Sequence, residues 1–261
     1  MSFHSSPSRG NPFPSQFPPQ RNSIPSTPPL NPFPRQPLTQ PRNYSNPLSN
    51  YQPRETIALA NPTNFGERYF QDINGNPVSN APIIVLHETV SAGWSAVRMF
   101  QTYHANDDDQ SSYHTLIKLD GTIFYIVPPD KRAFGAGNSV FASTRGIEGV
   151  KTNRLFPPSV NNFAYHISFE SPVDGRGNGR SHSGYTDAQY KSAAWLVART
   201  GVPEERVTTH KGVDRSRTRI DPRSFDMNKF RQYLSAFPKT QEILIGCPTA
   251  APTVNPPDGA F

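Results

Sequence analysis

The sequence has a single cysteine and no long apolar run, so it has little that could cross-link the chain or anchor it in a membrane. Its 261 residues include one cysteine, Cys247, which excludes an internal disulfide framework and any metal cage built from several cysteines. No run of about 18 apolar residues occurs, so we predict no transmembrane helix. Hydrophobic residues make up 34% of the chain and charged residues 18%. Both shares are below those of typical globular chains, so one globular domain over the whole length is not expected.

Acidic residues and lysine are absent from residues 1–54, which hold five arginines. Because the formal net charge of the chain is +6, the remaining 207 residues carry only about +1 (6 − 5). The part of the chain that can fold therefore lacks the basic footprint of a nucleic-acid-binding protein. We expect no nucleic-acid partner.

The same segment contains 14 of the 29 prolines, and Asn-Pro-Phe-Pro occurs at 11–14 and again at 31–34. Such a composition cannot bury enough apolar surface to offset the entropy lost on ordering. We predict a disordered proline-rich tail over 1–55, one α/β domain over 56–245 and a second disordered tail over 246–261. The first tail also lacks the roughly 7–15-residue apolar run of a secretory signal.

Hydrophobic spacing predicts alternating strands and helices within the domain. Residues 82–89 indicate a central strand, because four successive apolar residues precede His87 and fit a strand that is covered on both faces. A turn at Asp120-Gly121 indicates a hairpin, and Thr186 with Gln189 forms a capping box. The other predicted elements are a helix over 92–104, two strands within 113–127, a strand over 164–171, a helix from 186 to about 201 and a helix over 226–236.

Two histidines and one aspartate are candidate metal ligands. His87 lies at the C-terminal end of the predicted central strand, where open α/β sheets place their sites, although a lone histidine there is more often structural. His210 and Asp221 lie near the end of the domain, too loosely spaced to form a motif. Two imidazoles and a carboxylate are a ligand set that zinc accepts at catalytic sites, with a fourth position left for water.

Two further residues are candidates for the same site. Strand parity places His166, Ser168 and Glu170 on one face. A carboxylate there can take a proton from an attacking water and return it to a leaving amine, but an exposed glutamate at a strand end fits equally well. Trp94 follows the His87 strand and forms either a groove wall or part of the core.

Five motifs follow one another along residues 80–236. They are Ile-Val-Leu-His87-Glu-Thr, Ser-Tyr113-His-Thr-Leu-Ile-Lys-Leu-Asp-Gly-Thr-Ile, Arg132-Ala-Phe-Gly-Ala-Gly137-Asn-Ser, Ile-Ser-Phe-Glu170 and His210…Asp221-Pro-Arg-Ser-Phe. Their order resembles that of the zinc-dependent N-acetylmuramoyl-L-alanine amidases of the type-2 class, whose superfamily includes phage lysozyme-type amidases and peptidoglycan recognition proteins. The resemblance implies a mixed central β-sheet flanked by helices, with Zn²⁺ in a groove that binds peptidoglycan or muropeptides.

The implied reaction is hydrolysis of the amide that joins the lactyl group of N-acetylmuramic acid to L-alanine. By motif, the metal ligands correspond to His87, His210 and Asp221, the acid/base carboxylate to Glu170, and a site-lining tyrosine to Tyr113. Arg219 stands where many members have a catalytic lysine. Its charge suits a developing oxyanion, but its pKa is too high for proton donation.

Three departures from the family pattern stand out. Besides Arg219, Gly135 stands where many members have a histidine, and His166-Ile-Ser168 replaces the usual small residue and glycine before Glu170. By parity His166 faces the site, where it would serve as a replacement proton relay or else as a packed histidine. These departures keep an alternative open, a non-catalytic module that binds peptidoglycan without cutting it.

The substrate that the resemblance implies indicates a location in the cell wall or periplasm. No signal peptide is visible in the sequence, however, so recycling of muropeptides in the cytoplasm is the alternative. We expect a monomer.

Overall fold

The computed structural model describes residue 48 and residues 50–246. The predicted tails over 1–55 and 246–261 therefore lie mostly outside the described residues. Residues 50–54, which we predicted as part of the first tail, pack on the domain. The hydroxyl of Tyr51 is hydrogen-bonded to the Ser192 hydroxyl at 2.8 Å, and its ring lies 6.0 Å from that of Phe237.

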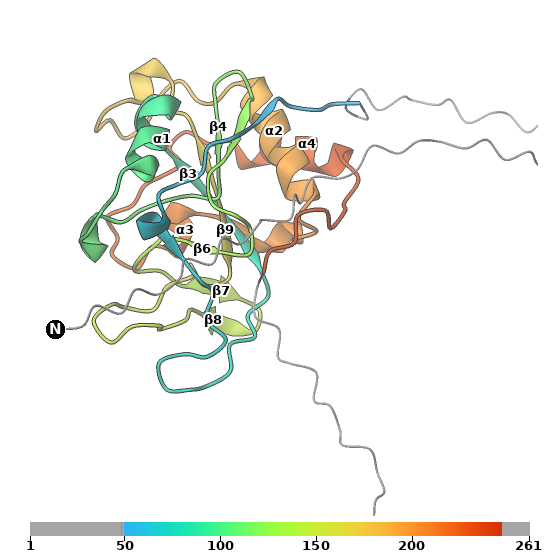
Figure 1. Ribbon diagram of the computed structural model, residues 1–261. Coiled ribbons are helices and arrows are strands. Elements are labelled where there is room, and N and C mark those ends of the chain that lie inside the picture. The colour runs from blue at the N-terminus through green and yellow to red at the C-terminus, as the bar shows by residue number, and fades with distance from the viewer. Residues whose placement is uncertain (1–47, 49, 247–261) are drawn as a thin grey trace, which may run out of the picture. The chain divides into compact units, whose positions relative to one another are not determined.

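Six strands form the central sheet in the order β1–β5–β4–β9–β3–β10 (Figure 1). Their bounds are β1 Glu55–Ile57, β3 Ile83–Glu88, β4 Thr115–Ile117, β5 Ile123–Tyr125, β9 Ala164–Phe169 and β10 Val207–Thr209. Only β4 and β5 run antiparallel, across the predicted turn at Asp120-Gly121, and the other neighbours are parallel. The predicted mixed sheet flanked by helices is thus confirmed.

Within the described residues, four α-helices accompany the sheet. They are α1 Gly93–Gln101, α2 Asp187–Ala198, α3 His210–Val213 and α4 Met227–Ala236. The predicted capping box is present at the start of α2, where Thr186 and Gln189 bond each other's backbone. The helix α1 ends before the predicted residue 104, because Thr102 already has an extended backbone. No helix in the described part of the chain is long and apolar enough to span a membrane.

Short strands and 3-10 turns occupy the connections. The strands are β2 Phe65–Gly66, β6 Arg132–Ala133, β7 Phe141–Ser143 and β8 Gly146–Glu148, and the turns are Pro62–Asn64, Asp107–Asp109, Val173–Gly175 and Glu204–Arg206. The strands β2 and β6 pair with each other, as do β7 and β8. The connection over 128–163 therefore contains its own hairpin.

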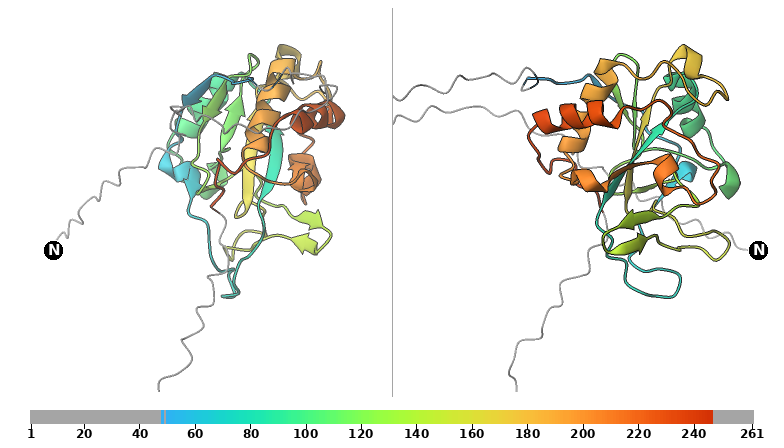
Figure 2. Two further views of the ribbon diagram at one scale, coloured as in Figure 1. Left: turned by 90° about the vertical axis from the view of Figure 1, so that its right-hand side faces the viewer. Right: turned by 180° about the vertical axis from the view of Figure 1, so that it is seen from behind.

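Strand parity divides the core between the two faces of the sheet. On one face, Ile84 and Leu86 of β3 pack with residues of α2 and α4, which lie together on one side of the sheet in Figure 2. On the other face, Ile83 and Val85 pack against the loops and α3, while α1 covers β4 and β5. His87 continues this second series and so points into the same layer.

The strand β9 is buried along its whole length, on both faces. Its sequence has polar residues at alternate positions, a pattern typical of a strand with one solvated face. The structure instead places it in the middle of the sheet, between β4 and β3. Its polar side chains, His166 and Ser168, are consequently enclosed. Ser168 pairs directly with His87 across the strands.

Candidate active site

His87, His210 and Asp221 come together at the C-terminal end of the parallel strands. The strand β10 runs beside β3 with Thr209 opposite Leu86, so His210, the next residue, lies beside His87. The chain then leaves α3 and returns, and the backbone N–H of Lys211 donates to the carbonyl oxygen of Asp221 at 3.0 Å. The sheet register and this one bond bring the three predicted ligands together.

The side chains of the three residues present a compact set of donor atoms. One ligand atom from each residue lies within 4.8 Å of the others. Nδ1 of His210 is 3.1 Å from the Asp221 carboxylate, and Nδ1 of His87 is 3.4 Å from Asp221 Oδ2. His87 is fully buried and His210 is 8% exposed, so a bound ion would be largely enclosed by protein.

The protonation states of this group suit a metal. Burial lowers the pKa of His87 to about 4, so its imidazole is neutral at pH 7. Burial alone would raise the pKa of Asp221, but the close contacts with His210 and His87 outweigh it and hold that pKa well below its usual range. Metal binding requires neutral imidazole and ionised carboxylate, and His87 and Asp221 meet these requirements without a change of pH.

The donor set also fits zinc. Within the described residues, Nδ1 of His87 is buried and makes no hydrogen bond of good geometry. A buried nitrogen lone pair without a partner is costly unless a ligand uses it. Two histidines and one carboxylate form a ligand set known from catalytic zinc sites. The residues present therefore fit the metal that the sequence predicts.

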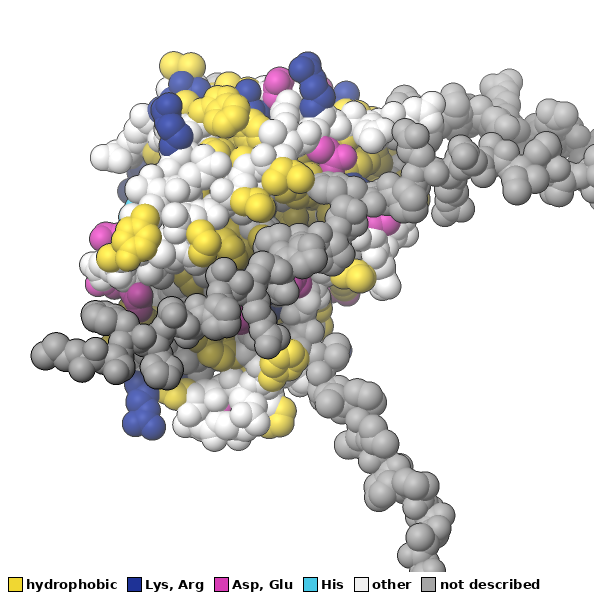
Figure 3. Space-filling model, viewed as in Figure 1, with side chains coloured by type: hydrophobic (Ala, Val, Ile, Leu, Met, Phe, Trp, Pro, Cys, Tyr) yellow, Lys and Arg dark blue, Asp and Glu magenta, His cyan; other side chains and the backbone are white. Residues whose placement is uncertain are grey.

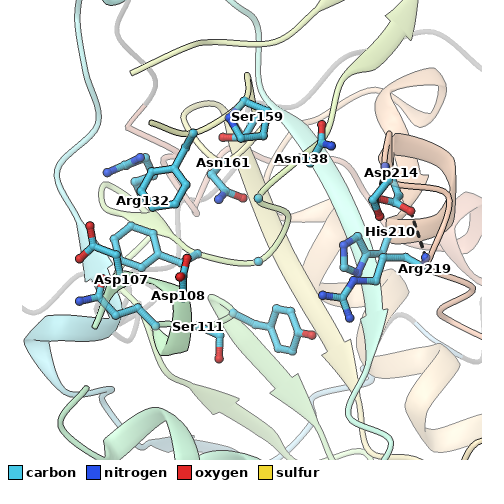
Figure 4. Close-up of a pocket in the computed structure, with 18 of the residues that line it drawn as sticks. Asp107, Asp108, Ser111, Arg132, Asn138, Ser159, Asn161, His210, Asp214 and Arg219 are labelled. Carbon is cyan, nitrogen blue, oxygen red and sulfur yellow. Dashed lines mark hydrogen bonds between the residues drawn. The ribbon is translucent and has the colours of Figure 1, made fainter. Parts of the chain in front are cut away.

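A groove of about 970 Å³ opens over this group. His210 and Asp221 line it, whereas His87 lies behind them. Figure 4 shows His210 and Arg219 at one end and Asp107, Asp108 and Arg132 at the other. One end of the groove therefore lies at the candidate metal site, and the other end carries both acidic and basic side chains.

Tyr113 lines the groove beside the candidate ligands. Its ring lies 4.4 Å from that of His87 and meets Phe100 of α1 edge-on at 5.4 Å. Burial, together with the negative charge of Asp221, raises the pKa of Tyr113. The phenol therefore stays protonated, packs against the His87 ring and keeps a hydrogen-bond donor at the groove.

Arg219 is exposed and also lines the groove. Its backbone N–H donates to Asp214 at 3.0 Å, the contact drawn as a dashed line in Figure 4. Asp214 also accepts the backbone N–H groups of Ser216 and Thr218, each at 2.9 Å. The loop that carries Arg219 is thus organised by one carboxylate, whose importance the sequence did not reveal because it falls within no motif.

The sequence of residues 76–224 matches the family of N-acetylmuramoyl-L-alanine amidases, a span of more than half of the chain. The chain belongs to this family. The matched span contains His87, His210 and Asp221, as well as Tyr113 and Arg219. The resemblance predicted from the five motifs is therefore confirmed, and so is the predicted class of enzyme.

The amidase is also similar to proteins of known structure. An AmpD derivative aligns with a TM-score of 0.48 at 25% identity, over 70% of this chain and 94% of that chain. AmiD from E. coli, solved in complex with anhydro-N-acetylmuramic acid-L-Ala-D-γ-Glu-L-Lys, aligns with a TM-score of 0.45 at 18% identity, over 65% of each chain. LysC from Clostridium intestinale aligns at 0.40 and 18% identity, over 69% of this chain and 97% of that chain. No curated protein sequence matches the amidase.

Glu170 lies outside the residues that line the groove. It is 6% exposed, and its carboxylate accepts from the backbone N–H of Leu119 at 3.2 Å and from Arg176 at 3.3 Å. It also packs against Gly93, where an added Cβ would lie 3.2 Å from Oε2. These contacts join the β4–β5 turn, the start of α1 and the loop after β9. They favour a structural role over the predicted acid/base role.

Replacing Glu170 by glutamine should accordingly lower kcat by no more than about threefold. Loss of a general acid–base group would instead lower kcat by about 10²–10⁴-fold. Turnover of a soluble muropeptide would be compared with that of a Glu67→Gln control. Glu67 is an exposed glutamate that likewise pairs with a base, Lys131, at 2.9 Å. A hundredfold loss in a folded Glu170→Gln protein with its metal intact would restore the acid/base role.

Trp94 also lies outside the groove lining. Its ring packs at 4.8 Å on Phe124 of β5 and is 52% exposed. Other hydrophobic side chains are exposed as well, as Figure 3 shows for one face of the molecule. The structure therefore supports neither a groove wall nor a fully enclosed core position for Trp94.

Proposed function

We propose that this amidase uses zinc to hydrolyse the bond between N-acetylmuramic acid and L-alanine in peptidoglycan or muropeptides. The observation that carries the proposal is the convergence of His87, His210 and Asp221 beneath an open groove. Packing of the hydrophobic core does not bring two imidazoles and an ionised carboxylate together at the ends of the strands. Their placement at the C-terminal ends of parallel strands is the usual position of an active site in α/β folds.

We assign the metal to Nδ1 of His87, Nδ1 of His210 and the carboxylate of Asp221. Zinc held there would supply Lewis-acid activation of the scissile carbonyl and of the attacking water. Arg219 contributes positive charge at the groove, which stabilises the oxyanion that develops as the amide is attacked. Its contribution is electrostatic alone, since a guanidinium does not give up its proton. Tyr113 holds the His87 ring from the groove side.

The activity should depend on metal. Purified protein would be incubated with peptidoglycan and with a soluble muropeptide, with and without a strong chelator, and the products identified by mass spectrometry. We expect free L-alanine amino termini and unsubstituted muramic acid, lost with chelator and restored by zinc. The effect should be at least about a thousandfold, because metal activation supplies several kcal/mol and each 1.36 kcal/mol is a factor of ten in rate.

Two other outcomes carry distinct meanings. Cleavage that persists after the metal has been removed would contradict zinc dependence while leaving the bond specificity intact. Tight muropeptide binding by the folded, zinc-loaded protein without any cleavage would instead support the alternative of a recognition module. An Arg219→Lys protein would then show whether the arginine at this position prevents the reaction.

A further inference from the structure

A second histidine stands directly behind the candidate ligand His87. His166 lies on β9, the strand beside β3, and its side chain is fully buried. Nδ1 of His166 is 2.8 Å from Nε2 of His87. The nitrogen of His87 that faces Asp221 is the other one, Nδ1. The two ring nitrogens of His87 thus have separate tasks, one toward the ligand group and one toward His166.

The positions of the protons follow from this arrangement. A metal on Nδ1 of His87 needs that lone pair, so the ring must carry its proton on Nε2. The Nε2–H can then donate only to Nδ1 of His166, which must be unprotonated. The opposite arrangement would place a proton on Nδ1 of His87 and block the metal.

The His166 ring is fixed from behind by His114. The two rings are stacked 5.7 Å apart, with an angle of 9° between their planes. The backbone N–H of His166 donates to Nδ1 of His114 at 2.9 Å, and that of His114 donates to the carbonyl oxygen of His166 at 3.0 Å. His114 is in turn held by Arg68 at 3.3 Å. His166 therefore has little freedom to turn away from His87.

Gly135 leaves the space that the His166 ring occupies. A Cβ added at Gly135 would lie 2.6 Å from Nδ1 of His166 and 2.8 Å from its Cγ, closer than real carbon atoms approach. The glycine cannot easily retreat, because its neighbour Ala136 donates its N–H to Asn161 at 2.9 Å. Gly137, in the same loop, has nothing within 4 Å of an added Cβ. The demand for glycine is thus specific to position 135.

We propose that His166 is a positioning residue for the metal site, and that Gly135 is required because it admits the His166 ring. His166 accepts the Nε2–H of His87, fixes the tautomer and the plane of that ring, and keeps Nδ1 aimed at the metal. It does not line the groove, so it acts through His87 and not as the proton relay that its strand parity first indicated. This inference rests on the proposed zinc site. Hydrogen bonds to a metal-bound histidine typically change metal affinity by about 10–100-fold.

Zinc affinity tests the proposal without reference to turnover. The dissociation constant of the full-length protein would be measured by competition with a chromophoric chelator. We expect His166→Leu to bind zinc about 10–100-fold more weakly than the unaltered protein. His166→Asn should recover most of the affinity, because its amide oxygen can stand near the position of Nδ1 and accept the same hydrogen bond.

The two glycines provide a matched pair of variants. Gly135→Ala should weaken zinc binding to a similar extent, whereas Gly137→Ala should bind as the unaltered protein does. In a protein that already carries His166→Ala, the Gly135→Ala change should cause no additional loss, because the ring it would strike is gone. Nitrogen-15 NMR of the zinc-loaded protein should also show His166 unprotonated at Nδ1.

The possible results separate this inference from the proposed function. If the unaltered protein binds no zinc, the proposed function and this inference both fail. If it binds zinc and the folded His166→Leu protein binds it equally well, only the inference is overturned. A His166 ring protonated at Nδ1 in the zinc-loaded protein would overturn it too. Should His166→Leu not fold, the two glycine variants and the NMR spectrum of the unaltered protein still decide.

Discussion

Replacing Asp221 by alanine should abolish zinc retention and amidase activity together. Asp221 is the one carboxylate in the ligand group, and both histidines direct Nδ1 toward it. Without it, only the two imidazoles remain, and they lack the negative charge that offsets that of the ion. We expect turnover to fall at least about a thousandfold, because metal activation supplies several kcal/mol of barrier lowering.

The measurement is zinc content after gel filtration, paired with cleavage of a soluble muropeptide. Asp107 is the matched control for the metal readout, because it is another aspartate of the groove lining, at the opposite end from His210 (Figure 4). Asp107→Ala should retain one zinc per chain. If Asp221→Ala also retained stoichiometric zinc, the ligand assignment would be wrong, whatever happened to activity.

Three of the residues singled out from the sequence lie together in the structure, whereas Glu170 lies apart from the groove. His87 follows an aliphatic strand, and the family motifs fix its partners. Glu170 has the right residue type and the right strand parity, but parity predicts only the face of the sheet on which a side chain lies. The position along the strand relative to His87 depends on the register of β9 against β3, in which His87 is opposite Ser168. Glu170 lies two residues farther along the chain and meets Leu119 and Arg176 instead.

The position of β9 within the sheet was equally hard to predict. The strand β9 has polar residues at alternate positions, which indicates one solvated face when the sequence is considered alone. Its place between β4 and β3 encloses those residues, and the enclosed His166 finds partners in His87 and His114. Such partners come from other parts of the chain. A pattern along one segment cannot reveal them, because pairing is settled only when the sheet forms.

A buried ion pair lies close to the ligand group along the chain. Glu88, the residue after His87, accepts from Nε of Arg223 at 2.5 Å and from its backbone N–H at 3.0 Å. Glu88 is 3% exposed and Arg223 is 4% exposed. The Arg223 guanidinium also donates to three carbonyl oxygens of the glycine-rich loop, those of Gly175, Gly177 and Gly179. One arginine therefore joins β3, the Asp221 segment and this loop.

Replacing Arg223 by methionine should lower the free energy of unfolding by about 3–5 kcal/mol, because it leaves the Glu88 carboxylate buried without its cation. Urea denaturation of the metal-free protein would measure this. Arg231→Met is the matched control, since Arg231 pairs with Glu204 at 2.9 Å but both side chains are about half exposed. Exposed pairs contribute only about 0–1 kcal/mol.

A double variant distinguishes an unpaired charge from the loss of the loop contacts. If the unpaired charge dominates, Glu88→Gln combined with Arg223→Met should be more stable than Arg223→Met alone, because no charge is then buried. If the loop carbonyls dominate, the double variant should be no more stable than the single one.

Zinc binding should weaken in Arg223→Met as well, because Glu88 directly follows His87 in the chain and Arg223 lies two residues beyond Asp221. The ion pair thus couples the stability of the fold to the spacing of the metal ligands, and a destabilised protein with unchanged zinc affinity would refute that coupling.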